Sequence, residues 1–166
     1  MNKIQIIVNN GAGTGSAVAV WKETKEYLQE NGISYNAYLT RYEKHAVKLA
    51  GQICGKIPQG PIYLLVVGGD GTINEVLNGI TDFDRVRLGV IPTGSGNDFA
   101  RNLGILRDTR EDLREITACI DQEQNGEKLQ RIDLGKVSWE GCEKPRIFGI
   151  SAGAGLDAIV CKKALH

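Results

Sequence analysis

Three glycine-rich turns, each placed directly after a largely apolar run, constrain the fold of this chain more than any other feature. The turns occupy residues 9–15, 68–71 and 92–98. The runs before them span residues 4–8, 62–67 and 86–91. A short apolar run that stops at glycine is typical of a buried strand, because glycine permits the tight turn that must follow. Each turn is therefore predicted to lead from a strand into a helix.

The segments between these runs have helical spacing. Apolar residues recur at intervals of three and four within residues 17–28, 46–54, 73–80 and 113–120,. A further strand is predicted over residues 33–39. This alternation predicts an α/β fold, a mostly parallel sheet with helices on both faces. Because the carboxyl ends of parallel strands share one edge, the three turns and Thr40 are expected to converge there, where such sheets bind ligands.

The pattern changes near residue 130. Residues 130–139 alternate as a strand does, and the phase slips at Gly135, which predicts a bulge,. Residues 140–143 read as a hairpin turn and residues 146–152 as a returning strand. We therefore predict two domains, an α/β domain over residues 1–128 and the beginning of a truncated β-rich domain over residues 129–166. A two-stranded hairpin is marginal alone, so we expect either that the chain is an N-terminal piece of a longer protein or that these strands dock elsewhere.

Charge and cysteine content exclude several classes of protein. The 20 basic and 20 acidic residues cancel, which argues against a nucleic-acid partner,. The four cysteines lie far apart without metal-ligand spacing, so we expect reduced thiols and assign no metal-binding residues,. The chain shows neither a signal peptide nor an apolar run long enough to cross a membrane, so a cytoplasmic protein is expected.

The glycine turns also carry the chemistry. A turn that opens a helix points backbone N–H groups at one spot, which suits a phosphate. Asp70 places a carboxylate beside that spot, where Mg²⁺ would need one, and is the candidate catalytic residue of this chain,. The sequence lacks the lysine-containing P-loop, and residues 11–16 do not match the dinucleotide-binding glycine pattern,.

Two of these turns resemble one family closely. Val67-Gly68-Gly69-Asp70-Gly71-Thr72 followed by Asn74-Glu75, and then Pro92 to Arg101, resemble the catalytic domain of diacylglycerol kinases. That lipid kinase family includes sphingosine kinases and bacterial soluble lipid kinases. The first turn is similar to the family's Asn-Pro-x-Ser-Gly-x-Gly, with Asn10 and Ala12 in place of the proline and serine. Residues 148–158 resemble the family's entry into its β-rich second domain.

The resemblance implies an ATP-dependent lipid kinase that binds ATP between two domains. The implied nucleotide-binding residues are Asn9, Asn10, Gly11, Ala12, Gly13, Thr40, Gly69, Asp70, Gly71, Thr72, Ile73, Asn74, Glu75 and Ser95. It further implies Mg²⁺ and a lipid substrate, diacylglycerol or a relative, met peripherally at a membrane surface. In the family the general base comes from the β-rich domain, so this chain alone is expected to bind nucleotide but to lack kinase activity.

Several alternatives remain open at this point. An NAD kinase shares the Gly-Gly-Asp-Gly element, and a non-catalytic nucleotide-binding or regulatory module would show the same turns. Thr72 and Glu75 also fit a capping box that ties the start of their own helix. Asn97 and Asp98 fit helix caps as well as site residues. The roles of Arg101 and Asp157, the lipid acceptor and the formation of a homodimer are undecided.

Overall fold

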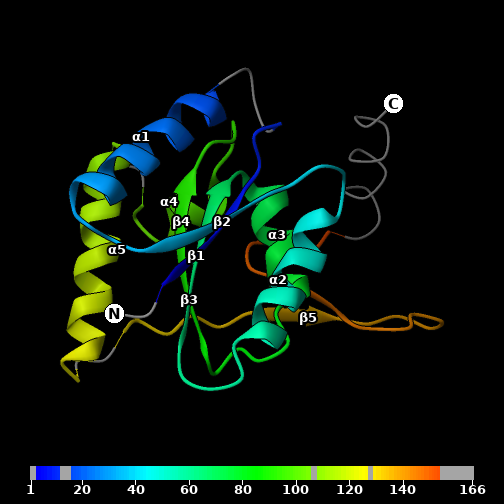
Figure 1. The fold of residues 1–166 in the computed structure, drawn as a ribbon. Coiled ribbons are helices and arrows are strands. Elements are labelled where there is room, and N and C mark those ends of the chain that lie inside the picture. Colours follow the sequence, from blue (N-terminus) through cyan, green and yellow to red (C-terminus); the bar gives the residue numbers. More distant parts are fainter. Residues whose placement is uncertain (1–2, 12–15, 106–107, 127–128, 154–166) are drawn as a thin grey trace.

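A four-stranded parallel sheet forms the centre of the molecule. The computed structural model describes residues 3–11, 16–105, 108–126 and 129–153. The sheet has the order β2-β1-β3-β4, and all three neighbouring pairs are parallel. Its strands are β1 (Ile4–Val8), β2 (Tyr35–Leu39), β3 (Ile62–Gly68) and β4 (Val86–Pro92). The predicted α/β fold is confirmed, and Figure 1 shows the sheet between its helices.

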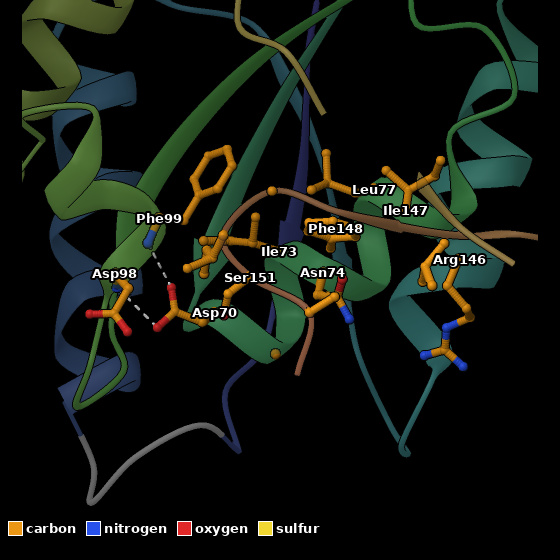
Figure 2. A pocket seen from close by; sticks show the side chains of 15 residues that line it. Asp70, Ile73, Asn74, Leu77, Asp98, Phe99, Arg146, Ile147, Phe148 and Ser151 are labelled. Carbon is orange, nitrogen blue, oxygen red and sulfur yellow. Dashed lines mark hydrogen bonds between the residues drawn. The ribbon is translucent and has the colours of Figure 1, made fainter. Parts of the chain in front are cut away.

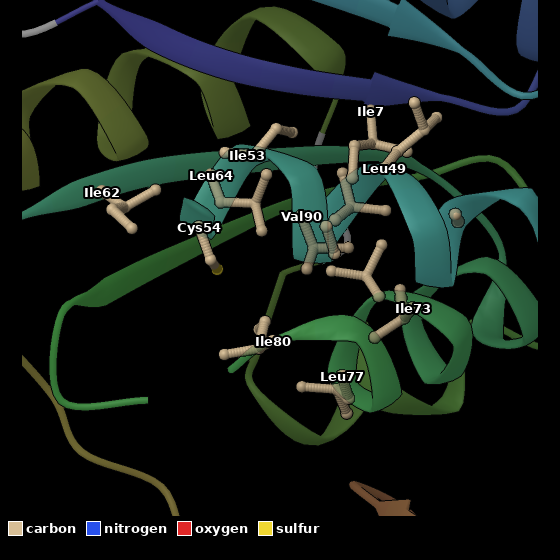
Figure 3. Close-up of a cluster of buried hydrophobic side chains, with 14 of the residues drawn as sticks. Ile7, Leu49, Ile53, Cys54, Ile62, Leu64, Ile73, Leu77, Ile80 and Val90 are labelled. Atoms are coloured by element: carbon tan, nitrogen blue, oxygen red, sulfur yellow. The ribbon is translucent and has the colours of Figure 1, made fainter. Parts of the chain in front are cut away.

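Helices cover both faces of this sheet. On one face pack α1 (Ser16–Glu30) and α5 (Thr109–Gln124), and on the other pack α2 (His45–Lys56), α3 (Asp70–Gly79) and the short α4 (Asp98–Asn102). Side chains of β3 alternate between the two cores, as the pleat of a strand requires. Leu64 and Val66 join the α2–α3 core, which Figure 3 shows, whereas Leu65 and Val67 join the α1–α5 core.

The two cores contain the residues that the helical spacing placed inside. Trp21 of α1 and Cys54 of α2 are both buried, as expected from their positions on apolar helix faces. Asp108 is the N-cap of α5, and its carboxylate accepts hydrogen bonds from the backbone N–H groups of Arg110 and Glu111,.

Helices α2 and α3 approach each other unusually closely. A Cβ atom built on Gly79 of α3 would lie 2.2 Å from the carbonyl oxygen of Val47 in α2. No real side chain tolerates that separation, so glycine is required where the two helix backbones meet. The two helices therefore pack as one unit, and this packing fixes the position of α3 against the sheet.

The second sheet is a short antiparallel hairpin of β5 (Gly135–Val137) and β6 (Arg146–Phe148). The predicted strands over residues 130–139 and 146–152 were too long. The ladder begins at Gly135, which pairs with Phe148, so the phase slip marks the start of the ladder rather than a bulge within it. Leu134, just before it, packs against the α2–α3 core instead. The predicted turn is confirmed at Glu140 and Gly141.

Candidate functional site

The second and third glycine turns meet at the carboxyl edge of the sheet. A Cβ atom on Gly94 would lie 2.9 Å from the Cα atom of Gly69, so the two turns are in backbone contact. The backbone N–H of Thr93 also donates to the carbonyl oxygen of Gly68, at 3.2 Å. Glycine at both positions allows this approach, which confirms the expected convergence of the turns.

Asp70 joins the starts of two helices. It is the first residue of α3, and its carboxylate oxygens accept hydrogen bonds from the backbone N–H groups of Asp98 at 3.0 Å and Phe99 at 3.1 Å. Both bonds are drawn in Figure 2. The carboxylate thereby caps α4, which position alone had suggested for Asn97. The Asn97 side chain makes no cap bond and instead bonds both backbone groups of Gly94.

The first glycine turn is tied to the same edge through Asn9. Its side-chain amide donates to the hydroxyl of Thr72 at 2.9 Å, and its side-chain oxygen accepts from the backbone N–H of Gly11 at 3.1 Å. Asn9 therefore holds the beginning of this turn beside the first turn of α3. The predicted nucleotide-binding residues Ala12 and Gly13 lie outside the described residues.

Glu75 has a role that differs from the predicted capping box. The N-cap of α3 is Gly69 rather than Thr72, and glycine has no side chain with which to cap the helix. The Glu75 carboxylate instead accepts from the backbone N–H groups of Lys44 at 3.0 Å and Ala46 at 3.2 Å. It thus caps α2, the neighbouring helix. The capping-box interpretation was wrong because the close packing of α2 on α3 brings another helix terminus within reach.

A pocket of about 380 Å³ opens beside these turns. One wall comes from α3 and the start of α4, and the other from residues 146–152, which Figure 2 shows facing each other. Leu77, Phe99 and Phe148 contribute apolar surface, whereas Asp70 and Asp98 stand at one end. The volume is in the range of small-molecule sites, and the mixed lining suits a ligand with one charged end.

The predicted nucleotide-binding residues divide into three groups. Asp70, Gly71, Ile73 and Asn74 line the pocket. Asn9, Gly11, Gly69 and Thr72 support the turns beside it. The remaining described residues, Asn10, Thr40, Glu75 and Ser95, are not among its lining residues.

The sequence did not reveal the second wall of the pocket, which residues 146–152 form. Phe99 and residues 146–152 line the pocket but were not predicted as site residues. The similarity of residues 148–158 to the entry of a second domain was the available signal, since a domain junction is a common ligand site. Asp157, whose role was undecided, lies outside the described residues.

Two carboxylates surround Gly96 at the mouth of the pocket. A Cβ atom there would lie 3.2 Å from Asp70 Oδ2 and 3.8 Å from Asp98 Oδ2. Asp98 also pairs with Arg101 at 3.5 Å, and both side chains are more than half exposed, so this ion pair is weak,. Within the described ranges, no three His, Cys, Asp or Glu side chains are grouped to hold a metal ion. A cation here would therefore need oxygen ligands from elsewhere as well.

Comparison with known proteins decides the family. Residues 3–137 match the diacylglycerol kinase catalytic domain. The chain belongs to this lipid kinase family. YtlR of Bacillus subtilis (strain 168), for which a lipid kinase function has been suggested, is 32% identical over 162 residues, covering 96% of this chain and 50% of YtlR. A diacylglycerol kinase of Mycobacterium tuberculosis (strain ATCC 25618 / H37Rv) is 28% identical over 165 residues, covering 99% of this chain and 49% of that protein.

Solved structures agree with this assignment. The crystal structure of a diacylglycerol kinase from Bacillus anthracis matches with a TM-score of 0.58 and 29% identity, over 70% of this chain and 39% of that one. The chain spans about half the length of the two curated relatives described above. In the part of the chain that the structure describes, no helix is both long and apolar enough to cross a membrane.

Proposed function

We propose that this chain is the nucleotide-binding part of an enzyme that transfers the γ-phosphate of ATP to a lipid hydroxyl, that of diacylglycerol or a related lipid. The observation that carries the proposal is the position of the α3 N-terminus at the mouth of the pocket, with Asp70 beside it. The family membership supports a kinase, and the pocket geometry supports a phosphate-bearing ligand.

The first turn of α3 suits a phosphate. Its first intrahelical hydrogen bond runs from Ile73 N–H to the carbonyl oxygen of Gly69, so the preceding amides of the turn need partners from outside the helix,. No described residue comes within 4 Å of a Cβ atom built on Gly71, so the described part of the structure leaves the helix uncovered there. A polyphosphate beside Gly71 would accept from these amides and gain from the positive end of the helix dipole.

The carboxylates at this end fit a magnesium nucleotide better than a free one. Asp70 and Asp98 would repel bare phosphate oxygens, and Mg²⁺ between the two removes that repulsion. Within the described residues, Asp70 uses one lone pair on each oxygen to cap α4, which leaves further lone pairs for a cation,. These residues therefore fit Mg²⁺ bound together with phosphate oxygens. When bound, the ion would neutralise charge on the phosphates during phosphoryl transfer.

Family membership, rather than the pocket, supports a lipid acceptor. Because the chain spans about half the length of its relatives, we propose that phosphoryl transfer needs further residues of a longer protein, including the general base. That protein would meet its substrate peripherally at a membrane surface.

Two assays test the proposal. Calorimetric titration of the chain with Mg·ATP should show one binding site. Radiolabelled ATP mixed with diacylglycerol vesicles should give labelled lipid with a longer protein and none with this chain alone. Binding without transfer by any longer protein would favour a regulatory module. Transfer to NAD rather than to lipid would favour an NAD kinase, and transfer to lipid by this chain alone would contradict its assignment as a binding part.

A further inference from the structure

Asn78, in the last turn of α3, binds the backbone of β6 as a neighbouring strand would. Its Nδ2 donates to the carbonyl oxygen of Ile147 at 2.8 Å, and its Oδ1 accepts from the Ile147 N–H at 2.9 Å. A second Nδ2 bond, also 2.8 Å, reaches the carbonyl oxygen of Asn74 within α3. The three bonds use both N–H groups and the oxygen, so they fix the orientation of the amide.

This arrangement requires the asparagine side chain. Aspartate has no N–H group to offer the carbonyl oxygens of Ile147 and Asn74, and its charged oxygen would face them instead. Glutamine is longer by one methylene group, and leucine has the size of asparagine but no polar atoms. The bonds to β6 therefore depend on this residue type at this position.

Among the described residues, two close contacts add to the packing of Ile147 on the α2–α3 core and hold the hairpin against the α/β domain. Asn78 supplies hydrogen bonds at Ile147, and Gly149 packs so tightly that a Cβ atom there would lie 2.6 Å from Phe99 Cε2 and 3.1 Å from Leu77 Cδ1. Elsewhere β5 and β6 pair with each other. A two-stranded hairpin is marginal in water, so its position depends on such anchors.

Asn78 also lies on α3, the helix that forms the pocket wall opposite residues 146–152. Asp70, Gly71, Ile73, Asn74 and Leu77 of α3 line one wall, and residues 146–152, which begin at β6, line the other. Figure 2 shows Ile147 and Phe148 lying along α3. The eight residue steps from Asp70 to Asn78 span about 12 Å of rigid helix. Fixing β6 at Asn78 therefore fixes the second wall relative to the phosphate-facing end.

We propose that Asn78 is a positioning residue whose side-chain amide sets the separation of the two walls of the nucleotide pocket. The inference rests on the proposed function, because it assumes that this pocket takes Mg·ATP. Asn78 itself is not among the residues that line the pocket. Its effect on the ligand passes through β6.

The test compares Asn78→Asp with Asn31→Asp in the whole chain. Asn31 directly follows α1, and its Nδ2 likewise donates to a backbone carbonyl, that of Tyr27, at 2.8 Å. Both substitutions add one negative charge at a helix C-terminus and remove a side-chain donor. We expect Asn78→Asp to raise the Kd for Mg·ATP about tenfold, equivalent to about 1.4 kcal/mol, and Asn31→Asp to leave it unchanged.

Hydrogen exchange separates positioning from general destabilisation. Without nucleotide, the Ile147 amide should exchange faster in Asn78→Asp than in the wild type. With Mg·ATP, protection of residues 69–73 should persist in the variant, whereas protection of residues 146–152 should be lost. Unchanged exchange at Ile147, or faster exchange with wild-type affinity, would overturn the proposal.

Two further controls make each outcome informative. If Asn78→Asp does not fold, Asn78→Ala removes the same bonds without adding charge and is measured in the same way. If the wild-type chain itself binds no Mg·ATP, the proposed function fails. Exchange at Ile147 in the free protein then still shows whether Asn78 anchors β6.

Discussion

Two glycines at the carboxyl edge of the sheet serve opposite physical purposes. Gly94 is needed because another backbone occupies the space of its side chain, with the Cα atom of Gly69 only 2.9 Å from its Cβ position. Gly71 has no described residue within 4 Å of its Cβ position, and its helical backbone is one that any residue could adopt. The described part of the protein therefore does not explain Gly71, whereas the proposed approach of a nucleotide to the helix would.

This contrast predicts opposite effects of one substitution on stability and binding. Gly71→Ala should stabilise the fold by about 0.4–1 kcal/mol, because alanine has less backbone freedom to lose on folding than glycine. It should also weaken Mg·ATP binding, since the methyl group covers the open face. Urea unfolding and calorimetry measure the two effects. Gly55→Ala in α2, where the space is also open, is the matched control and should change stability alone. Equal nucleotide affinity in both variants would refute the ligand explanation.

Substitution of Asp70 should lower both the stability of the fold and the affinity for Mg·ATP. In Asp70→Asn one oxygen can still accept from a backbone N–H of α4, but the new NH₂ group must face the other N–H. We expect a loss of about 1–3 kcal/mol in the free energy of unfolding and weaker binding of Mg·ATP. Denaturant unfolding and titration check these outcomes. Asp84→Asn removes a carboxylate whose side chain is 90% exposed and should change neither. Wild-type stability in Asp70→Asn would mean that the two bonds contribute little.

At the scale of elements, α2 and α3 act as a pair whose contacts organise the site. Glu75 of α3 caps α2, and Gly79 of α3 lies against the Val47 carbonyl of α2. The Glu75 contact fixes the segment that follows Thr40. Thr40 itself is held at the sheet edge by its backbone bond to Val8. Although Glu75 is not among the residues that line the pocket, it therefore orders one side of the edge.

Loss of the Glu75 carboxylate should loosen α2 at its first turn. We expect Glu75→Ala to cost about 0.5–2 kcal/mol, the usual effect of removing a helix cap. Exchange of the Lys44 and Ala46 amides should accelerate before any other part of α2. Glu43→Ala, whose side chain is 85% exposed beside the same helix, should leave both amides unchanged. Slow exchange in Glu75→Ala would show that α2 does not need this cap.

The close approach of the two helices predicts a large effect from a small side chain. Gly79→Ala should destabilise the protein by about 1–3 kcal/mol or more, because its methyl group would force the backbones apart. Gly51→Ala in α2 is the matched control, since its Cβ atom would lie at an ordinary 3.4 Å from the Gly79 carbonyl oxygen. Urea midpoints compare the two variants. Equal midpoints would mean that α2 and α3 can shift without loss.

At the scale of the whole molecule, the parallel sheet lies between the pocket and the α1–α5 face, which has an ion pair of its own. On the far face, Arg110 of α5 binds both carboxylate oxygens of Glu30 in α1, at 2.9 and 3.0 Å. The hydrogen bond from Arg110 holds the pKa of Glu30 below its usual 4.5. The lowered pKa means that the pair stabilises the fold above about pH 4.5 and loses this effect as pH falls through the lowered pKa.

The separation of the faces gives a prediction about pH. Glu30→Gln should be less stable than the wild type at pH 7, and the difference should disappear as pH falls below the lowered pKa. Its affinity for Mg·ATP at pH 7 should equal that of the wild type, because the pair lies across the sheet from the pocket. Urea unfolding across pH 3–7 tests the first point. A stability difference that grows toward low pH would contradict the sign of this linkage.

Much of the fold could be predicted because the apolar pattern is local. Residues 62–67 and 73–80 already show a buried strand and an amphipathic helix, and the turn between them must lie at the carboxyl edge. Glu75 and Asn78 could not be assigned in this way. Their partners, Lys44 and Ile147, are 31 and 69 residues away and are set by helix packing and hairpin placement. The second wall was missed for the same reason.

Hydrogen exchange of the chain with and without Mg·ATP tests the central claim most directly, because it locates the nucleotide as well as detecting it. The account predicts that added nucleotide slows exchange at residues 69–73 and 146–152 and leaves α1 and α5 unchanged. Absence of any change at millimolar Mg·ATP, or protection confined to the α1–α5 face, would contradict it.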